Sequence, residues 1–280
     1  METQGNARRA EHARFFTTER FDSLECVTAV LLRPRFTLHA HDTYTIGNIH
    51  AGHGWLGVRG RRHDTGPEHF LLHNPGDVHD GHPDECGIHY RNSYPSVALL
   101  RQVASEVSGR RVTDTPFFPT PVVHDPDGIA LFLAAHRALD EGRDTLAADE
   151  LLSRAYAHCL VRHAAIVPAG VGDEGGPVAR AGALMQARYA EDVGLSDLAA
   201  VAGLSAHHLI RAFRRHTGFT PHAFLVNRRV NAARHLLRQR GASLADVAAA
   251  TGFCDQAHFT RAFKARVGVT PGSYRAAVAA

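Results

Sequence analysis

The stretch GFCDQAHFTRAFKARVGVTPGSYR at 252–275 closely repeats an earlier stretch, GLSAHHLIRAFRRHTGFTPHAFL, at 203–225. Both contain Arg-Ala-Phe followed by a basic residue, then a glycine, then Thr-Pro. Phe213 aligns with Phe263 at an offset of 50 residues. A sequence that occurs twice with these features predicts one structural unit that occurs twice.

Each copy has the pattern of a helix-turn-helix motif, with a short helix, a glycine turn and a second capped helix. The expected cap and turn residues of the first copy are Ser196, Gly203, Ser205 and Gly218. Their counterparts in the second copy are Ser243, Gly252, Asp255 and Gly268. The two motifs are predicted at 195–216 and 244–266.

The second helix of each motif is amphipathic, which separates a core side from an outer side. The core side is expected to hold Leu209, Ala212 and Phe213 in one copy and Phe259, Ala262 and Phe263 in the other. The outer side then holds His207, Ile210, Arg211 and Arg214, and in the second copy Gln256, Ala257, Thr260, Arg261 and Lys264. Such hydrogen-bond donors and small apolar groups can read base edges in a major groove of DNA.

A long helix is predicted between the motifs, at 221–240, with Thr220 as its cap and Pro221 in its first turn. About 20 residues at 1.5 Å each span roughly 30 Å. One turn of B-DNA is about 34 Å long. A helix of this length would allow the two reading helices to enter successive major grooves.

The charge of the chain is unevenly distributed. From Pro177 onward there are 14 Arg and Lys against 5 Asp and Glu, a net +9, while the preceding residues carry a net −6. A basic C-terminal third favours a polyanionic partner that binds there. Because 30 of the 31 basic residues are Arg, a bias in composition is the alternative explanation.

The residues before the repeat have a different pattern of apolar and turn-forming residues. Short β-branched runs at 24–100 are typical of a small antiparallel β domain, and two helical patterns follow at 126–141 and 146–166. The Gly- and Pro-rich stretch VPAGVGDEGGP predicts a linker. We therefore expect an α+β protein of two domains, composed of a β domain (1–125), a helical pair (126–167), a flexible linker (168–177) and a DNA-binding domain (178–280).

The region 178–275 resembles the DNA-binding domain of the AraC/XylS family of bacterial transcription regulators. The repeated stretches quoted above carry this resemblance, and the second fits the family signature nearly end to end. The resemblance implies that the base-reading positions are His207, Ile210 and Arg211, then Gln256, Ala257, Thr260 and Arg261.

Residues 24–100 resemble the cupin-like effector-binding domain of such regulators, a small β-barrel. His39-x-His41 and Pro75-Gly76-Asp77-Val78-His79 correspond to the two cupin motifs. The favoured expectation is a polar pocket for a small-molecule effector, lined by His39, His41, Tyr44 and His79.

A three-imidazole metal site at His39, His41 and His79 is the less favoured alternative. The carboxylate that metal cupins usually have after the His-x-His motif is missing, and Thr43, Tyr44 and Thr45 follow instead. No cofactor is therefore expected.

These observations predict a ligand-responsive, sequence-specific DNA-binding regulator that is not an enzyme. Two alternatives stay open: a metal-dependent cupin enzyme fused to a DNA-binding module, and a constitutive DNA binder whose β domain only dimerises. The expected partners are a double-stranded DNA operator, a small effector and a second copy of the chain, which would bind through the helical pair. An activator would also contact RNA polymerase.

The N-terminal stretch METQGNARRAEHARFF lacks the apolar core of a signal peptide, and no run of 18 apolar residues occurs. Four widely spaced cysteines form no CxxC pair and are expected to be reduced thiols. A cytoplasmic protein without a membrane partner is the expectation.

Overall fold

The computed structural model describes residues 11–32, 36–170, 174–237, 239, 241–267 and 269–278. It divides into two compact units, one made of Met1–Asp140 with Arg154–Pro168 and the other of Glu141–Ser153 with Ala169–Ala280. One of the boundaries between them, Ser153 to Arg154, falls within the helix α4 (Thr145–His163). The expected α+β fold is confirmed, with a sheet unit and a helical unit.

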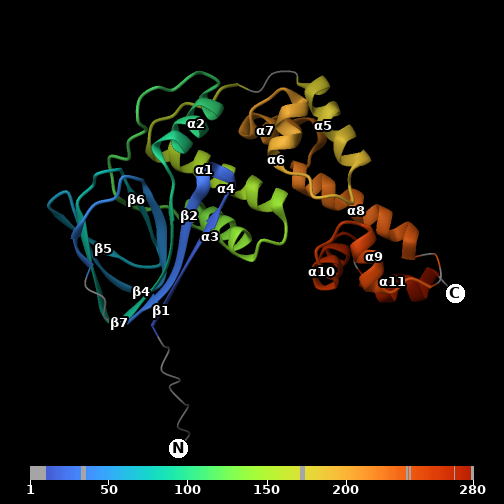
Figure 1. Ribbon diagram of the computed structural model, residues 1–280, viewed down its shortest axis with the longest axis horizontal. Coiled ribbons are helices and arrows are strands. Elements are labelled where there is room, and N and C mark those ends of the chain that lie inside the picture. Colours follow the sequence, from blue (N-terminus) through green and yellow to red (C-terminus); the bar gives the residue numbers. More distant parts are fainter. Residues whose placement is uncertain are drawn as a thin grey trace, which may run out of the picture. The chain divides into compact units, whose positions relative to one another are not determined.

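The sheet unit is built on eight antiparallel strands (Figure 1). They are β1 (His12–Thr18), β2 (Leu24–Leu31), β3 (Phe36–His39), β4 (Thr45–Val58), β5 (Arg61–Thr65), β6 (His69–His73), β7 (His79–Tyr94) and β8 (Val122–His124). The strand order is β1-β2-β7-β4-β6-β8, with β3 paired to β7 and β5 paired to β4. A helical turn, α1 (Arg20–Ser23), connects the first two strands.

The long strands β4 and β7 form the centre of this sheet. Their pairing runs from Ile46 opposite Ser93 to Val58 opposite His79, with register shifts in the middle. Gly52 and Gly87 meet at such a shift, both with positive φ, and a Cβ on Gly52 would lie only 2.1 Å from the Gly87 carbonyl oxygen. Only glycine fits this close approach, which lets the paired strands bend.

Three helices accompany the sheet: α2 (Val97–Ser108), α3 (Pro126–Glu141) and α4 (Thr145–His163). The prediction of a helix at 126–141 is confirmed, and the helix predicted at 146–166 ends three residues earlier. The helix α2 was not predicted from the sequence; its N-cap is Ser96, whose Oγ accepts a hydrogen bond from the Leu99 N–H at 3.0 Å. Its buried residues are Leu99, Leu100, Val103, Ala104 and Val107.

The helical unit contains α5 (Gly175–Ala187), α6 (Leu195–Ala202), α7 (Ala206–Thr217), α8 (Pro221–Leu237), α9 (Leu244–Ala250), α10 (Gln256–Val267) and α11 (Pro271–Val278). It has two hydrophobic clusters, one around α6 and α7 and one around α9 and α10. The helix α8 belongs to both, because Leu225 lies in the first cluster and Val230 in the second. Each half of the repeat therefore has its own small core.

Most predicted caps of the helical unit are confirmed. The Oγ of Ser205 accepts the His208 N–H at 3.3 Å, and the Oδ1 of Asp255 accepts the His258 N–H at 2.6 Å. Ser196 is wrong as a cap, because α6 already begins at Leu195 after Gly194. The C-terminal cap predicted at Gly268 lies outside the described residues.

Two predicted boundaries also differ. The helix α5 begins at Gly175, so the last three residues of the expected linker 168–177 are helical. The helix α8 comprises 17 residues up to Leu237, which corresponds to about 25 Å. It is shorter than the predicted helix at 221–240, part of which lies outside the described residues.

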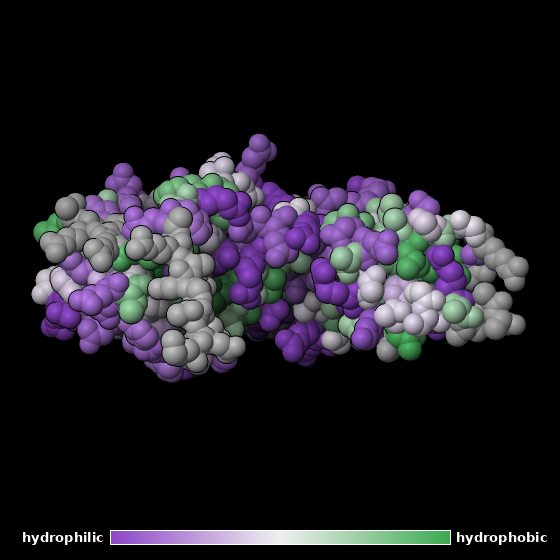
Figure 2. Space-filling model, turned by 90° about the horizontal axis from the view of Figure 1, so that it is seen from below, coloured by the Kyte–Doolittle hydropathy of each residue, from purple (hydrophilic) through white to green (hydrophobic). Residues whose placement is uncertain are grey.

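The described residues on the face of the molecule shown in Figure 2 are mainly polar. On the face shown in Figure 2, hydrophilic residues cover most of the described surface and hydrophobic residues form only small patches. Within the described parts of the chain, none of the helices has the length and apolar character required to span a membrane.

Candidate DNA-binding helices and effector pocket

The helix α10 presents a free outer face. Its core residues Phe259, Ala262 and Phe263 are buried, as predicted from their spacing. On the other side, Gln256, Ala257, Arg261 and Lys264 are exposed. Thr260 is half-buried, and its hydroxyl donates a hydrogen bond to the Gln256 carbonyl at 2.8 Å. The helix therefore exposes an amide, a methyl group, a guanidinium and an ammonium group on one face.

The helix α7 has the same core side, since Leu209, Ala212 and Phe213 are completely buried. Its outer side is less exposed to solvent than that of α10. Arg214 is exposed, whereas His207 and Arg211 are half-buried. The two copies of the repeat thus differ in how much of their outer face can reach a partner.

Ile210 contradicts the predicted outer face of α7. Its side chain is only 4% exposed and belongs to the hydrophobic cluster that also contains Val178 of α5. The equivalent residue in α10, Thr260, remains half-buried. An apolar side chain at the border between the two sides gains free energy by joining the core, and Ile210 does so.

The linker contacts the outer side of α7. The Arg211 guanidinium donates a hydrogen bond from Nη1 to the Ala169 carbonyl at 2.7 Å. The carboxylate of Glu174 lies 2.8 Å from the Nε2 of His208 and 3.9 Å from the Nε2 of His216. In this conformation, side chains of α7 are held by the segment that precedes α5.

His207 lies in the same covered region. Burial, together with the nearby charges of Arg211 and His208, lowers the pKa of His207 to about 4. Its imidazole is therefore neutral near pH 7. Its buried Nδ1 has no hydrogen-bond partner among the described residues.

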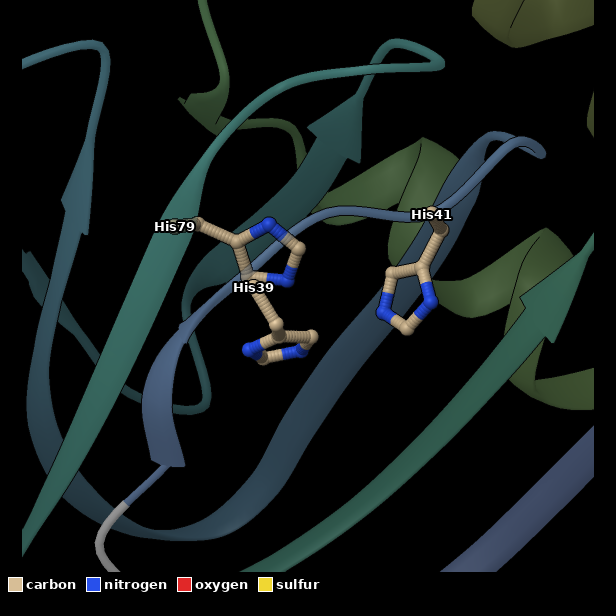
Figure 3. A group of neighbouring side chains, drawn as sticks. All are labelled: His39, His41 and His79. Atoms are coloured by element: carbon tan, nitrogen blue, oxygen red, sulfur yellow. The ribbon is translucent and has the colours of Figure 1, made fainter.

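In the sheet unit, His39, His41 and His79 converge on one space (Figure 3). The ring centroids of His39 and His79 are 4.3 Å apart, and those of His41 and His79 are 5.3 Å apart. Each imidazole offers a nitrogen that lies within 4.8 Å of the others. His39 lies opposite His79 across β3 and β7, and His41 lies in the loop that follows β3.

The tautomer of His79 follows from its partner. Its Nδ1 lies 2.8 Å from the Asp77 carbonyl, which only accepts hydrogen bonds, so Nδ1 carries the hydrogen and Nε2 keeps a lone pair. Asp77 is itself held by the Arg59 guanidinium at 2.8 Å and by the Asn74 N–H at 2.8 Å. The Pro-Gly-Asp turn therefore orients His79 through its backbone.

The three histidines line an open-mouthed cavity with about 700 Å³ of empty space, part of which is open to solvent. Its walls are formed by residues of β3 to β7 and of the loop after β3, and they include five histidines and several aromatic side chains. The polar and aromatic lining residues include His39, His41, Thr45, Trp55, His73, His79, His82, Tyr90, Asn92 and Tyr94. Among the lining residues that the structure describes, none is Asp, Glu, Lys or Arg.

Three lining residues carry buried polar atoms that lack a hydrogen-bond partner among the described residues. These atoms are Oγ1 of Thr45, both ring nitrogens of His73 and Oδ1 of Asn92. A buried polar group without a partner costs about 1–3 kcal/mol. A ligand that supplies these hydrogen bonds would remove that cost.

Three histidines of the cavity, His41, His73 and His79, have lowered pKa values. Burial, reinforced by the charge of His79, lowers the pKa of His73 to about 3. Burial also lowers the pKa of His41 and of His79. These three imidazoles therefore favour the neutral form and offer both hydrogen-bond donors and acceptors to the cavity.

Tyr44 does not line this cavity, contrary to the sequence prediction. Its side chain is completely buried, and its hydroxyl donates a hydrogen bond to the Pro116 carbonyl at 2.5 Å. Trp55 does line it, stacked on His82 with ring centroids 4.1 Å apart. The lining residues His73, Tyr90 and Tyr94 were not predicted from the sequence.

Comparison with known proteins places this fold in a family. Residues 198–277 match the model of a helix-turn-helix domain, and residues 23–155 match an AraC-like ligand binding domain. The HTH-type transcriptional regulator YbfI of Bacillus subtilis is 31% identical over 227 residues, which cover 80% of this chain and 81% of that protein. The chain belongs to the AraC family of transcription regulators.

Other similarities are narrower or weaker. An HTH-type transcriptional regulator of Haemophilus influenzae is 30% identical over 219 residues, or 75% of this chain and 67% of that protein. The DNA-binding domain of AdpA, solved in complex with a target DNA, is 33% identical and covers 36% of this chain and 91% of its own, with a TM-score of 0.35.

The expected function is thereby confirmed at the level of the family. This AraC-family chain is a DNA-binding transcription regulator with an AraC-like ligand-binding domain. The relatives named here are transcription regulators, and the residues that read DNA and bind a ligand remain to be assigned.

Proposed function

We propose that α10 and α7 of this AraC-family regulator read the operator, and that each helix binds in a major groove. The observation that carries the proposal is the free outer face of α10, where Gln256, Ala257 and Arg261 are exposed. Arg261 is suited to the N7 and O6 atoms of guanine, Gln256 to adenine and Ala257 to a thymine methyl group. Thr260 and Lys264 flank these residues and complete the face.

In α7 we assign base reading to His207 and Arg211 and phosphate contact to Arg214. Ile210 is excluded because it is buried. Arg211 must leave the Ala169 carbonyl before it can reach a base. Release of the linker is therefore part of DNA binding by this helix.

In vitro selection from random DNA, followed by a binding titration on the selected site, tests this proposal. Wild type should select a defined sequence, and the Gln256→Ala/Arg261→Ala double variant should lose most of its preference for it over random DNA. Selection of the same site with the same affinity by the double variant would refute reading by α10.

We further propose that the cavity of the sheet unit binds a small uncharged effector that has both hydrogen-bond donors and acceptors. The oxygen of Asn92 needs a donor, whereas neutral His73 offers one donor and one acceptor. Trp55 and Tyr90 offer flat surfaces for an apolar or planar part of the same molecule. Hydroxylated or amide-bearing compounds of this size fit these requirements.

A thermal-shift screen of such neutral compounds with the full chain tests the effector proposal. A binder should raise the melting temperature of wild type and change its affinity for the selected DNA. It should have little effect on His73→Leu, which keeps an apolar wall but loses both nitrogens. Operator affinity unaffected by every bound compound would favour the constitutive alternative.

A metal-dependent enzyme is the second candidate, because His39, His41 and His79 each offer a nitrogen within 4.8 Å of the others. Stoichiometric iron or manganese that His39→Gln/His41→Gln lacks would favour it. Retention of normal DNA binding and effector response by that variant, without bound metal, would favour the sensor.

Homodimerisation through residues 126–167 is also proposed. Val161 of α4 is 37% exposed, which leaves an apolar side chain available on this pair of helices. Sedimentation at micromolar concentration, with and without DNA, should show a dimer, and a monomer under both conditions would contradict it. Contact with RNA polymerase is expected only if the protein activates transcription.

A further inference from the structure

Asp125, His158 and His163 form a second cluster of metal-ligating side chains, outside the cavity described above. Asp125 directly precedes α3, and both histidines belong to α4 (Figure 1). The Nε2 atoms of His158 and His163 lie 2.8 and 2.7 Å from the same oxygen, Oδ2 of Asp125. All three residues offer a donor atom within 4.8 Å of the other two.

The cluster is largely shielded from solvent. The side chain of Asp125 is 5% exposed, that of His158 is 24% exposed and that of His163 is 14% exposed. Such shielding limits the competition of bulk water for the donor atoms. It also strengthens any electrostatic interaction with a bound cation.

The backbone of α3 orients the carboxylate. The Gly128 N–H donates a hydrogen bond to Oδ1 of Asp125 at 3.0 Å, and the Ile129 N–H donates to its carbonyl at 2.9 Å. Asp125 thus caps α3, with Pro126 in the first helical position. Because Oδ1 is engaged, Oδ2 points to the two imidazoles, as in metal sites whose ligating carboxylates are held by further hydrogen bonds.

Gly128 leaves the room that the cluster needs. A Cβ at this position would lie 2.6 Å from Oδ2 of Asp125 and 3.1 Å from Cδ2 of His158. Any larger residue would displace one of these groups. Glycine inside a helix costs about 0.5–1 kcal/mol relative to alanine, so its position beside the cluster has a structural explanation.

We propose that Asp125, His158 and His163 bind a divalent transition-metal ion. Two imidazole nitrogens and one carboxylate oxygen suit zinc, which prefers tetrahedral sites with such ligands. Zinc bonds of about 2.0–2.2 Å place tetrahedral donors roughly 3.3 Å apart. The side chains must therefore open by about half an ångström, and a water molecule completes the coordination.

Such an ion would join the start of α3 to the end of α4, because Asp125 precedes the first helix and His163 ends the second. The site is independent of the effector proposal. Without metal, the same contacts can form if both imidazoles donate their Nε2–H to the carboxylate. The experiment has to separate a metal site from this hydrogen-bonded triad.

The test uses the full chain in the His39→Gln/His41→Gln background, which removes the other cluster. After treatment with a chelator and gel filtration, the protein is titrated with Zn²⁺ against a competing indicator. Co²⁺ is added in a parallel titration, because its visible d–d absorption reports the coordination geometry. We expect about one equivalent of Zn²⁺ and the intense absorption of a tetrahedral Co²⁺ site.

Asp125→Asn and His158→Gln are then introduced separately into this background. Asp125→Asn keeps an oxygen that can accept the Gly128 N–H, so the cap of α3 is preserved. Removing an outer-shell partner typically weakens a site 10–100-fold, so loss of a ligand should weaken Zn²⁺ binding by about 100-fold or more. The matched control is His124→Gln, which changes an exposed neighbouring histidine and should bind as its parent does.

Three results would overturn the proposal. They are the absence of Zn²⁺ binding in the background protein, equal affinity in Asp125→Asn, and a Co²⁺ spectrum like that of the free aqueous ion. Circular dichroism of each variant verifies that the fold is retained. The His158→Gln variant keeps the cap of α3 fully intact, so it tests the site even if Asp125→Asn unfolds.

Discussion

The two helix-turn-helix motifs of the helical unit have similar sequences but different surroundings. In α10, Arg261 and Gln256 are exposed. In α7, Arg211 is bound to the Ala169 carbonyl and Ile210 is buried. The repeated sequence reproduces the helices and their cores, whereas the flanking segments decide which outer face is free.

Because of this difference, we assign different roles in DNA binding to α7 and α10. A face without internal partners can contact DNA immediately, and we assign this role to α10. A face that is held by the linker must first be released, and we assign this role to α7.

The turn glycines should differ in their tolerance of substitution. Gly203 and Gly252 both have positive φ, which costs an L-residue about 1–2 kcal/mol. A Cβ on Gly252 would also lie 2.8 Å from the Ala190 carbonyl oxygen, whereas near Gly203 the nearest atom is 3.9 Å away. Gly252→Ala should lower the free energy of unfolding by about 2–4 kcal/mol and Gly203→Ala by about 1 kcal/mol, measured by denaturant unfolding. Equal losses would show that the two turns are equivalent.

Arg261→Ala should weaken binding to the selected operator by about 1–3 kcal/mol and relax the preference at one base pair. Arg211→Ala should cost less, because the free protein already uses this guanidinium for the Ala169 carbonyl. Titrations of both variants on operator and on random DNA measure the difference. If Arg261→Ala lost equal affinity for both DNAs, Arg261 would not be a reader.

Glu174→Gln should strengthen DNA binding about 2–5-fold, since it weakens a partly exposed contact, worth roughly 0.2–1 kcal/mol, between the Glu174 carboxylate and the His208 imidazole of α7. Glu191→Gln is the matched control, because its carboxylate pairs with Arg188, and both residues lie outside α7 and α10. Unchanged or weaker binding by Glu174→Gln would argue against restraint of α7 by the linker.

Arg214→Ala should produce the smallest change in sequence preference. As a phosphate contact it should weaken operator and random DNA alike and reduce the slope of log K against log salt by about 0.9. Arg62→Ala, at a 66% exposed position in the sheet unit, is the control and should leave the slope unchanged. A loss of affinity confined to the operator would instead make Arg214 a base reader.

Much of the helical unit could be predicted from the sequence because local signals determine it. Ser205 and Asp255 mark helix starts, and the spacing of Leu209, Ala212 and Phe213 identifies the buried side. Ile210 could not be placed in this way. It lies at the border of that side, and neighbours from distant parts of the chain, including Val178 of α5, decide its burial.

The cavity of the sheet unit was harder to predict from the sequence, because strands from distant parts of the chain bring its residues together. The motifs around His39 and His79 identified three of the residues that line it, His39, His41 and His79. His73 lies in the otherwise apolar run HFLLH, which predicts a buried strand and gives no sign of a cavity. Tyr44 was misplaced because only the fold shows that its hydroxyl reaches Pro116. The cluster at Asp125 has no short motif, because its members are 33 and 38 residues apart.

The most direct test of paired reading by α7 and α10 is a footprint of the full chain on its selected operator. Two protected major-groove segments on one face of the DNA, separated by about 10–10.5 base pairs, are expected for the two reading helices. Arg261→Ala should reduce protection of one segment and Arg211→Ala protection of the other. Protection of a single groove, or a pattern that neither variant changes, would contradict the assignment of α7 and α10 as paired readers.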